Sequence, residues 1–220
     1  MTARTIVEHA KALLEPLPRA IRYTAILGGG ALRAFYDGTP IHDVDLFFRS
    51  RAEYDAAVFE LRRIGWTAEV SPRGVTNFRS PSGLLYSLIG FGFGAPLEHL
   101  TRFDFRCCQH IAGWISSATD EPVVLSAPGA AEEARCKLLY VVNNNGTERT
   151  LRRIRHYVED YGYELHPGQE EAEPEEEEDV PPGHLPQGVH GQPSVPPEDG
   201  GLIARALRRL ARIPVTTRGY

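Results

Sequence analysis

Residues 25–49 read AILGGGALRAFYDGTPIHDVDLFFR and decide the fold of this chain. The apolar start of the stretch ends at three consecutive glycines, residues 28–30. A helical pattern of apolar residues follows and ends at the turn cluster DGTP, residues 37–40. The stretch closes with the short strand-like run 44–48, which Asp43 precedes. It therefore predicts a strand, a glycine turn, a helix and a second strand in close succession.

Asp43 and Asp45 are two residues apart, so on a strand their side chains lie on the same face. Two neighbouring carboxylates repel each other, and each raises the pKa of the other unless a cation lies near them. Mg²⁺ prefers oxygen ligands and shares its coordination shell with substrate phosphates. A glycine turn that opens a helix offers backbone N–H groups to such phosphates. The stretch therefore predicts a metal-binding pair beside a phosphate-binding turn.

The pattern resembles the nucleotidyltransferase superfamily of the DNA polymerase β type. Gly28 and Gly29 are followed by thirteen residues and then by the triplet Asp43-Val44-Asp45 between apolar residues. The family has a third carboxylate on a later strand, and Asp104 in the run RFDFRC fits it. The resemblance covers residues 20–165 and is nearest to small stand-alone members of bacterial and phage type. It implies an α+β fold in which a mixed β-sheet is flanked by helices.

The resemblance also implies which residues form the site. Asp43 and Asp45 would hold two Mg²⁺ ions, with Mn²⁺ as an alternative. Asp104 would contact a metal and help to deprotonate the attacking hydroxyl. Gly28 and Gly29 would bind the β and γ phosphates of an NTP. Such a site transfers a nucleoside monophosphate to a hydroxyl and releases pyrophosphate.

Three site assignments have a plain structural alternative. Arg33 lies one helical turn beyond the glycines and would reach phosphate, but an ordinary surface arginine fits the sequence equally well. Lys137 would meet the triphosphate or be an isolated lysine without such a role. Asp104 would be a metal ligand or a surface strand residue paired with Arg102 or Arg106.

Composition divides the 220 residues into three parts. Residues 1–165 carry 19 basic and 19 acidic side chains, and we expect them to form the nucleotidyltransferase-like domain. Residues 166–200 have ten acids and no Lys or Arg, which predicts a disordered acidic linker. Residues 201–220 have five Arg and no acid, and residues 202–213 predict a basic amphipathic helix. That helix would bind a partner, nucleic acid or an anionic membrane, or dock on its own domain.

The three cysteines, Cys107, Cys108 and Cys136, are odd in number and lack a C-x-x-C spacing. This argues against a secreted disulfide framework. The first residues have no apolar run typical of a signal peptide, and no apolar run in the sequence is as long as a membrane span. We therefore expect a cytoplasmic protein without a membrane span.

Periodicity predicts the remaining elements. Helices are expected at residues 3–15, 51–64, 128–142 and 147–162. Strands are expected as a meander at 66–70, 75–79 and 84–91, and then at 102–107, 111–115 and 123–125.

Two classes of function fit this sequence. The leading hypothesis is an Mg²⁺-dependent nucleotidyltransferase that uses an NTP and an acceptor hydroxyl on an RNA or tRNA end, a small molecule or a protein. The alternative is a catalytically inactive protein of the same fold that binds a partner through its tail. A phosphatase of the haloacid dehalogenase type, with Asp43 as nucleophile, fits poorly because Pro40-Ile41-His42 is a poor match for the buried strand that precedes the nucleophile there. The intact set of acids favours the enzyme.

Overall fold

The protein is described from a computed structural model, in which residues 5–70, 74–114, 121–144 and 147–167 are described. The helix predicted at 202–213 lies outside the described residues, as does the predicted linker beyond residue 167.

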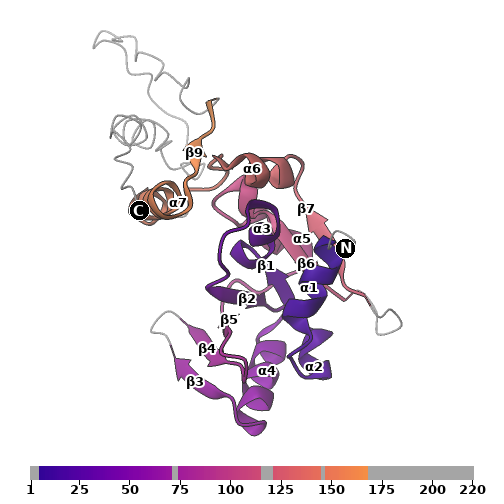
Figure 1. Ribbon diagram of the computed structural model, residues 1–220. Coiled ribbons are helices and arrows are strands. Elements are labelled where there is room, and N and C mark those ends of the chain that lie inside the picture. Colours follow the sequence, from indigo (N-terminus) through magenta and orange to yellow (C-terminus); the bar gives the residue numbers. More distant parts are fainter. Residues whose placement is uncertain (1–4, 71–73, 115–120, 145–146, 168–220) are drawn as a thin grey trace, which may run out of the picture.

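A mixed sheet of seven strands forms the centre of the protein, in the order β3-β4-β5-β2-β1-β6-β7 (Figure 1). Its strands are β1 (Ile26–Gly28), β2 (Asp43–Phe47), β3 (Thr67–Val70), β4 (Val75–Arg79), β5 (Leu85–Ile89), β6 (His110–Gly113) and β7 (Val123–Ser126). β2 and β5 are parallel, and the other neighbouring pairs are antiparallel. The mixed α+β architecture predicted from the sequence is therefore confirmed.

Helices flank this sheet, and a small second sheet follows it in sequence. The helices are α1 (Ile6–Leu14), α2 (Arg19–Arg22), α3 (Gly30–Asp37), α4 (Arg51–Arg63), α5 (Pro96–Thr101), the 3₁₀ turn η1 (Arg106–Cys108), α6 (Ala130–Cys136) and α7 (Thr147–Tyr161). The second sheet pairs β8 (Leu138–Leu139) with β9 (Glu164–Leu165) in parallel. None of the helices in the described ranges is long and apolar enough to cross a membrane.

The main core lies between one face of the sheet and helices α1 and α4. Side chains that alternate along β2 point to opposite faces, and Val44 and Leu46 are fully buried on the helix side. Leu14 of α1 and Leu61 of α4 are buried in the same cluster. Burial of one such side chain stabilises the fold by about 1.5–3 kcal/mol. The register of β2 is therefore fixed, and its other face carries the two aspartates.

A second hydrophobic cluster joins α6, α7 and η1 to the main sheet through α3. Figure 1 shows α6, α7 and β9 gathered beyond α3, at the far end of the molecule from β3 and β4. Phe105 and Ile154 are fully buried in this cluster, and the reduced Cys107 and Cys108 are buried with them. The protein therefore has two packed parts, and α3 contacts both.

The predictions of two elements from the sequence were wrong. No strand forms at 102–107: the segment begins at the C-cap of α5, Phe105 pairs only through an isolated bridge to Val141, and η1 begins at Arg106. The helix predicted to reach residue 142 ends at Cys136, where Lys137 adopts a left-handed conformation with φ of 53° and β8 begins. The helices predicted at 3–15, 51–64 and 147–162 are confirmed in the described residues as α1, α4 and α7.

Candidate functional site

The two aspartates lie on the face of β2 that is turned away from the main core. Asp43 is exposed and Asp45 is partly buried, whereas Val44 between them is fully buried. The side chain of Ser87 on β5 donates a hydrogen bond of 3.4 Å from Oγ to Oδ2 of Asp43. The predicted shared face of the two carboxylates is therefore present.

The environment of Asp45 disfavours its negative charge. Burial, followed by the neighbouring Asp43 carboxylate, raises the pKa of Asp45 from 3.8 to about 7, although the positive charge of Arg153 opposes the shift. A carboxylate pair with so little compensation gains most from a cation placed between the two groups. The electrostatics of the pair therefore fit a divalent metal.

The glycine turn lies directly beside this pair. Gly28 is the β-sheet partner of Asp45. A Cβ atom on Gly28 would come within 2.8 Å of the Phe103 ring and 3.2 Å of Phe47. Gly29 has a φ of 75°, which an L-residue rarely adopts, and a Cβ there would lie 3.0 Å from Phe103. Only glycine fits both positions, so the turn brings backbone close to the carboxylates.

The residues that line the cleft at the start of α3 lie two positions beyond the glycine pair that the sequence predicts to bind phosphate. The N–H of Gly29 donates to the carbonyl of His110 at 3.1 Å, so it is already used in the fold. Gly29 is instead the N-cap of α3, and Gly30 and Ala31 are the first helical residues. The N–H groups of these two positions have no acceptor within the helix, and both residues line the cleft beside the aspartates. Gly30 and Ala31 therefore add backbone donors at the cleft, and phosphate binding by the glycine turn stays a prediction.

A cleft of about 210 Å³ lies between β2, the start of α3 and helix α7. Its lining consists of Gly30, Ala31, Arg33, Pro40, Ile41, His42, Asp43, Asp45, Arg153, His156, Tyr157 and Tyr161. Arg153 and its neighbours on α7 line the same cleft as the aspartates, and the charge of Arg153 reaches Asp45. The cleft thus combines two carboxylates, a helix N-terminus and an arginine, which is a set of groups that binds a metal–phosphate complex.

Asp104 does not line the cleft that holds the aspartate pair. It is 2% exposed, and its Oδ2 accepts a hydrogen bond of 2.6 Å from Nη1 of Arg153. Among the described residues, no three His, Cys, Asp or Glu side chains form a metal-binding group. The predicted three-carboxylate site is therefore not assembled in this structure. The alternative of a surface residue paired with Arg102 or Arg106 is also wrong, because Asp104 is buried and its ion pair is with Arg153.

Arg33 is not the surface arginine that the sequence allows, and since it lines the cleft its contact with phosphate stays a prediction. It is 2% exposed, forms an ion pair of 3.2 Å with Asp37, and donates to Oγ1 of Thr39 at 3.0 Å. Its guanidinium carbon lies 4.7 Å and 4.6 Å from the ring centroids of Tyr157 and Tyr161 on α7. Arg33 therefore joins α3 to the far wall of the cleft.

Lys137 does not line the cleft either. Its Nζ donates to the carbonyl of Tyr161 at 2.8 Å, which ties the end of α6 to the end of α7. The contact predicted between Lys137 and a triphosphate is therefore not supported by its position.

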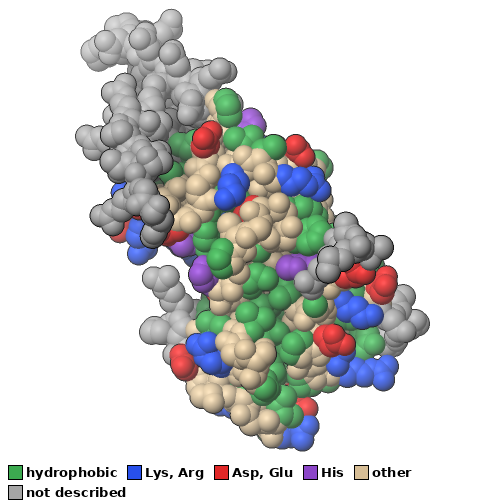
Figure 2. Space-filling model, in the orientation of Figure 1, with side chains coloured by type: hydrophobic (Ala, Val, Ile, Leu, Met, Phe, Trp, Pro, Cys, Tyr) green, Lys and Arg blue, Asp and Glu red, His purple; other side chains and the backbone are tan. Residues whose placement is uncertain are grey.

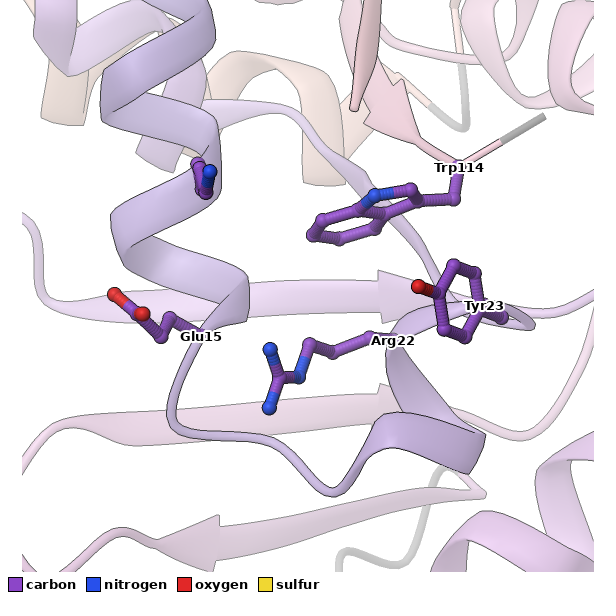
Figure 3. A pocket seen from close by; sticks show the side chains of 5 residues that line it. Glu15, Arg22, Tyr23 and Trp114 are labelled. Carbon is purple, nitrogen blue, oxygen red and sulfur yellow. The ribbon is translucent and has the colours of Figure 1, made fainter. Parts of the chain in front are cut away.

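A second pocket, of about 180 Å³, lies at the opposite end of β1 and β6. Lys11, Glu15, Arg22, Tyr23 and Trp114 line it, and Figure 3 shows the Arg22 side chain pointing toward the side of the pocket that holds Glu15. It has a single carboxylate and no glycine turn, so it lacks the groups that make the first cleft suited to a metal.

The surface in Figure 2 shows acidic and basic side chains interspersed, in keeping with the balanced charge of residues 1–165.

Solved structures of tRNA-processing enzymes have a similar fold. The chain is similar to a tRNA-processing enzyme in an apo form, at 16% identity and a TM-score of 0.53, over 76% of this chain and 45% of that one. It is also similar to the CCA-adding enzyme of Thermotoga maritima complexed with tRNA (14% identity, TM-score 0.52, 74% of this chain and 40% of that one). A CCA-adding enzyme in complex with ATP is similar at 14% identity and a TM-score of 0.55, over 73% and 40% of the two chains.

These similarities show that the chain shares the fold of these tRNA-processing enzymes, which agrees with the α+β fold that the resemblance implies. The chain spans less than half the length of each of these three proteins. No protein-family model and no curated protein sequence matches it. The nearness to bacterial and phage-type members stays a prediction.

Sequence reasoning missed Arg153 and Ser87. Arg153 is one of four arginines on the helix predicted at 147–162, and nothing in their spacing singles it out. Ser87 lies in an apolar run, where a lone serine is a weak signal. The pairing of β5 with β2 places it beside Asp45.

Proposed function

We propose that this chain is an Mg²⁺-dependent nucleotidyltransferase that moves a nucleoside monophosphate from an NTP to an acceptor hydroxyl and releases pyrophosphate. The observation that carries the proposal is the placement of Asp43 and Asp45 on one strand face, in the same cleft as the N-terminus of α3. The solved structures with a similar fold support it, since they include enzymes with bound ATP and bound tRNA.

The residues of the cleft fit a metal–nucleotide complex. Mg²⁺ in nucleotide sites is held by one or two carboxylates together with substrate phosphates, and Asp43 and Asp45 supply such a pair. Burial and the Asp43 carboxylate raise the pKa of Asp45 despite Arg153, so a bound cation would favour the ionised pair. When bound, the metal neutralises charge on the transferred phosphoryl group and lowers the pKa of the attacking hydroxyl. Mn²⁺ would serve the same ligands.

Backbone and side-chain groups of the cleft would bind the phosphates of the nucleotide. The N–H groups of Gly30 and Ala31 bind phosphate oxygens at the positive end of α3. Arg153 lies across the cleft and stabilises negative charge on the phosphates as the pyrophosphate leaves. Asp104 holds Arg153 in place through their ion pair. This assignment replaces a direct metal contact by Asp104.

The test is the release of pyrophosphate together with transfer of label. The protein is incubated with Mg²⁺, each α-labelled NTP in turn and a cell extract, and the labelled fraction is identified. Asp43→Asn with Asp45→Asn is expected to abolish both signals. Asp55→Asn, which removes an exposed carboxylate on α4, is the control and should retain them. A chain that binds Mg²⁺–NTP but releases no pyrophosphate with any acceptor would instead be a binding protein of the same fold.

A further inference from the structure

The second pocket, at the end of β1 and β6 opposite the cleft, gathers charged side chains from two helices. Lys11 and Glu15 come from the last turn and the C-cap of α1, and Arg22 ends α2. Lys11 and Glu15 are four residues apart, a spacing that lets opposite charges on a helix pair. In the described part of the chain, however, no ion pair joins Glu15 to either Lys11 or Arg22. The pocket therefore holds charges of both signs that do not neutralise one another.

The guanidinium of Arg22 is fixed in place but keeps donors for a ligand. Its Nε donates to the carbonyl of Leu17 at 2.8 Å, and Leu17 is itself buried. Neither Nη group of Arg22 donates to an acceptor within the described ranges. A guanidinium binds a carboxylate through two parallel N–H bonds. Arg22 therefore offers an anchored site for a carboxylate.

Two aromatic rings supply an apolar wall to the same pocket. Figure 3 shows Trp114 and Tyr23 on one side of the pocket and Glu15 on the other, with the Arg22 guanidinium between them. The ring centroids of Tyr23 and Trp114 are 5.7 Å apart at an interplanar angle of 67°. Trp114 is 7% exposed, and both rings pack against the main core. The wall is therefore held by the fold, and it offers the flat apolar surface that favours an apolar group on a ligand.

The volume of the pocket limits the size of that ligand. The cavity holds about 180 Å³. A cavity of about 150 Å³ accepts a benzene molecule, whereas pockets for drug-sized ligands measure about 300–1,000 Å³. A nucleotide is of the larger class, so it does not fit within this pocket. A single amino acid is of the size that does.

We propose that this pocket binds a free α-amino acid with an apolar side chain. The Nη groups of Arg22 and the ammonium of Lys11 bind its carboxylate. Glu15 binds its ammonium group, and its side chain packs on Trp114. Each charge of the ligand then meets an opposite charge of the protein, and its apolar part meets the aromatic wall. The pocket lies at the opposite end of β1 from Gly28, so this inference goes beyond the proposed nucleotidyl transfer and does not depend on it.

Calorimetry on the full chain, without nucleotide or metal, tests the class of ligand. The probes are L-phenylalanine, 3-phenylpropionate, which lacks the ammonium group, and phenethylamine, which lacks the carboxylate. L-Phenylalanine is expected to bind to one site per chain, and each of the other two at least about tenfold more weakly, the effect of losing one charged hydrogen bond. Binding of either truncated probe as tight as that of L-phenylalanine would overturn the amino-acid assignment. An absence of saturation with L-phenylalanine at about 10 mM would do the same.

Two variants assign each end of the ligand to its residue. Glu15→Gln is expected to weaken binding of L-phenylalanine about tenfold and to leave that of 3-phenylpropionate unchanged, because only the first probe carries an ammonium group. Arg22→Gln is expected to weaken binding of both of these probes and to leave that of phenethylamine unchanged. Arg62→Gln and Asp55→Asn, which change exposed residues of α4, are the controls and should bind all three probes as the wild-type protein does.

Affinities in Glu15→Gln and Arg22→Gln that equal those of the controls would overturn the location of the site. An equal loss of affinity for L-phenylalanine and 3-phenylpropionate in Glu15→Gln would overturn the binding of the ammonium group by Glu15, and with it the proposal. If Arg22→Gln does not fold because it loses the bond to Leu17, Lys11→Gln replaces it with the same expectation. No NTP is present in these measurements, so their outcome is separate from that of the test for nucleotidyl transfer.

Discussion

Replacing Asp45 by Asn should stabilise the metal-free protein at pH 8. The pKa of Asp45 is raised from 3.8 to about 7, so the folded protein holds this proton more tightly than the unfolded chain does. The stabilisation from this proton is present below pH 4, is lost as the pH rises toward 7, and is absent at pH 8. The full shift corresponds to about 4 kcal/mol at 1.36 kcal/mol per pH unit. Because Asp45 is only partly buried, solvent screening reduces the expected gain to about 2 kcal/mol.

The assay is thermal and urea unfolding in EDTA at a series of pH values. A gain of about 2 kcal/mol corresponds to a rise in Tm of about 4–8 °C for a chain of this size. Asp55→Asn, an exposed carboxylate paired with Arg51, is the control and should shift Tm by much less. Adding Mg²⁺ with an NTP should stabilise the wild-type protein and leave Asp45→Asn nearly unchanged, since the metal relieves the same repulsion. The electrostatic reasoning is refuted if Asp45→Asn shifts Tm at pH 8 no more than Asp55→Asn does. It is also refuted if Asp45→Asn still loses stability between pH 4 and 7 as the wild-type protein does.

Three further changes test the packing around the cleft. Gly29→Ala should lower the free energy of unfolding by about 1–2 kcal/mol, because Gly29 has a positive φ and lies beside the Phe103 ring. An unchanged urea midpoint would contradict the turn geometry. Asp104→Asn should cost about 1–3 kcal/mol and lower turnover, because it leaves Arg153 without its carboxylate; turnover at the wild-type level would show that Arg153 is held in other ways. Ile154→Ala should cost about 2–4 kcal/mol by opening a cavity in the second hydrophobic cluster, and calorimetry that shows no loss would contradict the packing of α7.

The aspartate pair and the glycine turn could be predicted because their signals are local. The two-residue spacing of Asp43 and Asp45 fixes their shared face wherever β2 lies, and a glycine run before a helical pattern marks a turn. The exact donors could not be predicted, since the N–H of Gly29 is taken by a carbonyl on β6, a strand distant in sequence. Local patterns identified the stretch, and long-range pairing decided which of its atoms remain available.

Around Asp104, in contrast, the local pattern gave a wrong prediction. Alternation of Phe103, Asp104 and Phe105 is typical of a strand, yet the segment follows a helix that Pro96 opens. The strand that does lie beside β2 in parallel is β5, and at the level of Asp45 it carries Ser87. A parallel neighbour is brought in by a long crossover, so no spacing in the sequence reveals which residue it places next to the pair.

The position of Arg33 has a consequence for how fast a ligand binds. The same helix, α3, contacts β2 on one side and carries Arg33 against the tyrosines of α7 on the other, so the two walls of the cleft are held at a set separation. Domain closure, where it occurs, adds a slow unimolecular step after the encounter. With the walls already joined, the nucleotide is expected to bind in one kinetic phase. The observed rate in stopped-flow fluorescence should rise linearly with NTP concentration and should not level off, and a second phase should emerge when Arg33→Ala disconnects the walls.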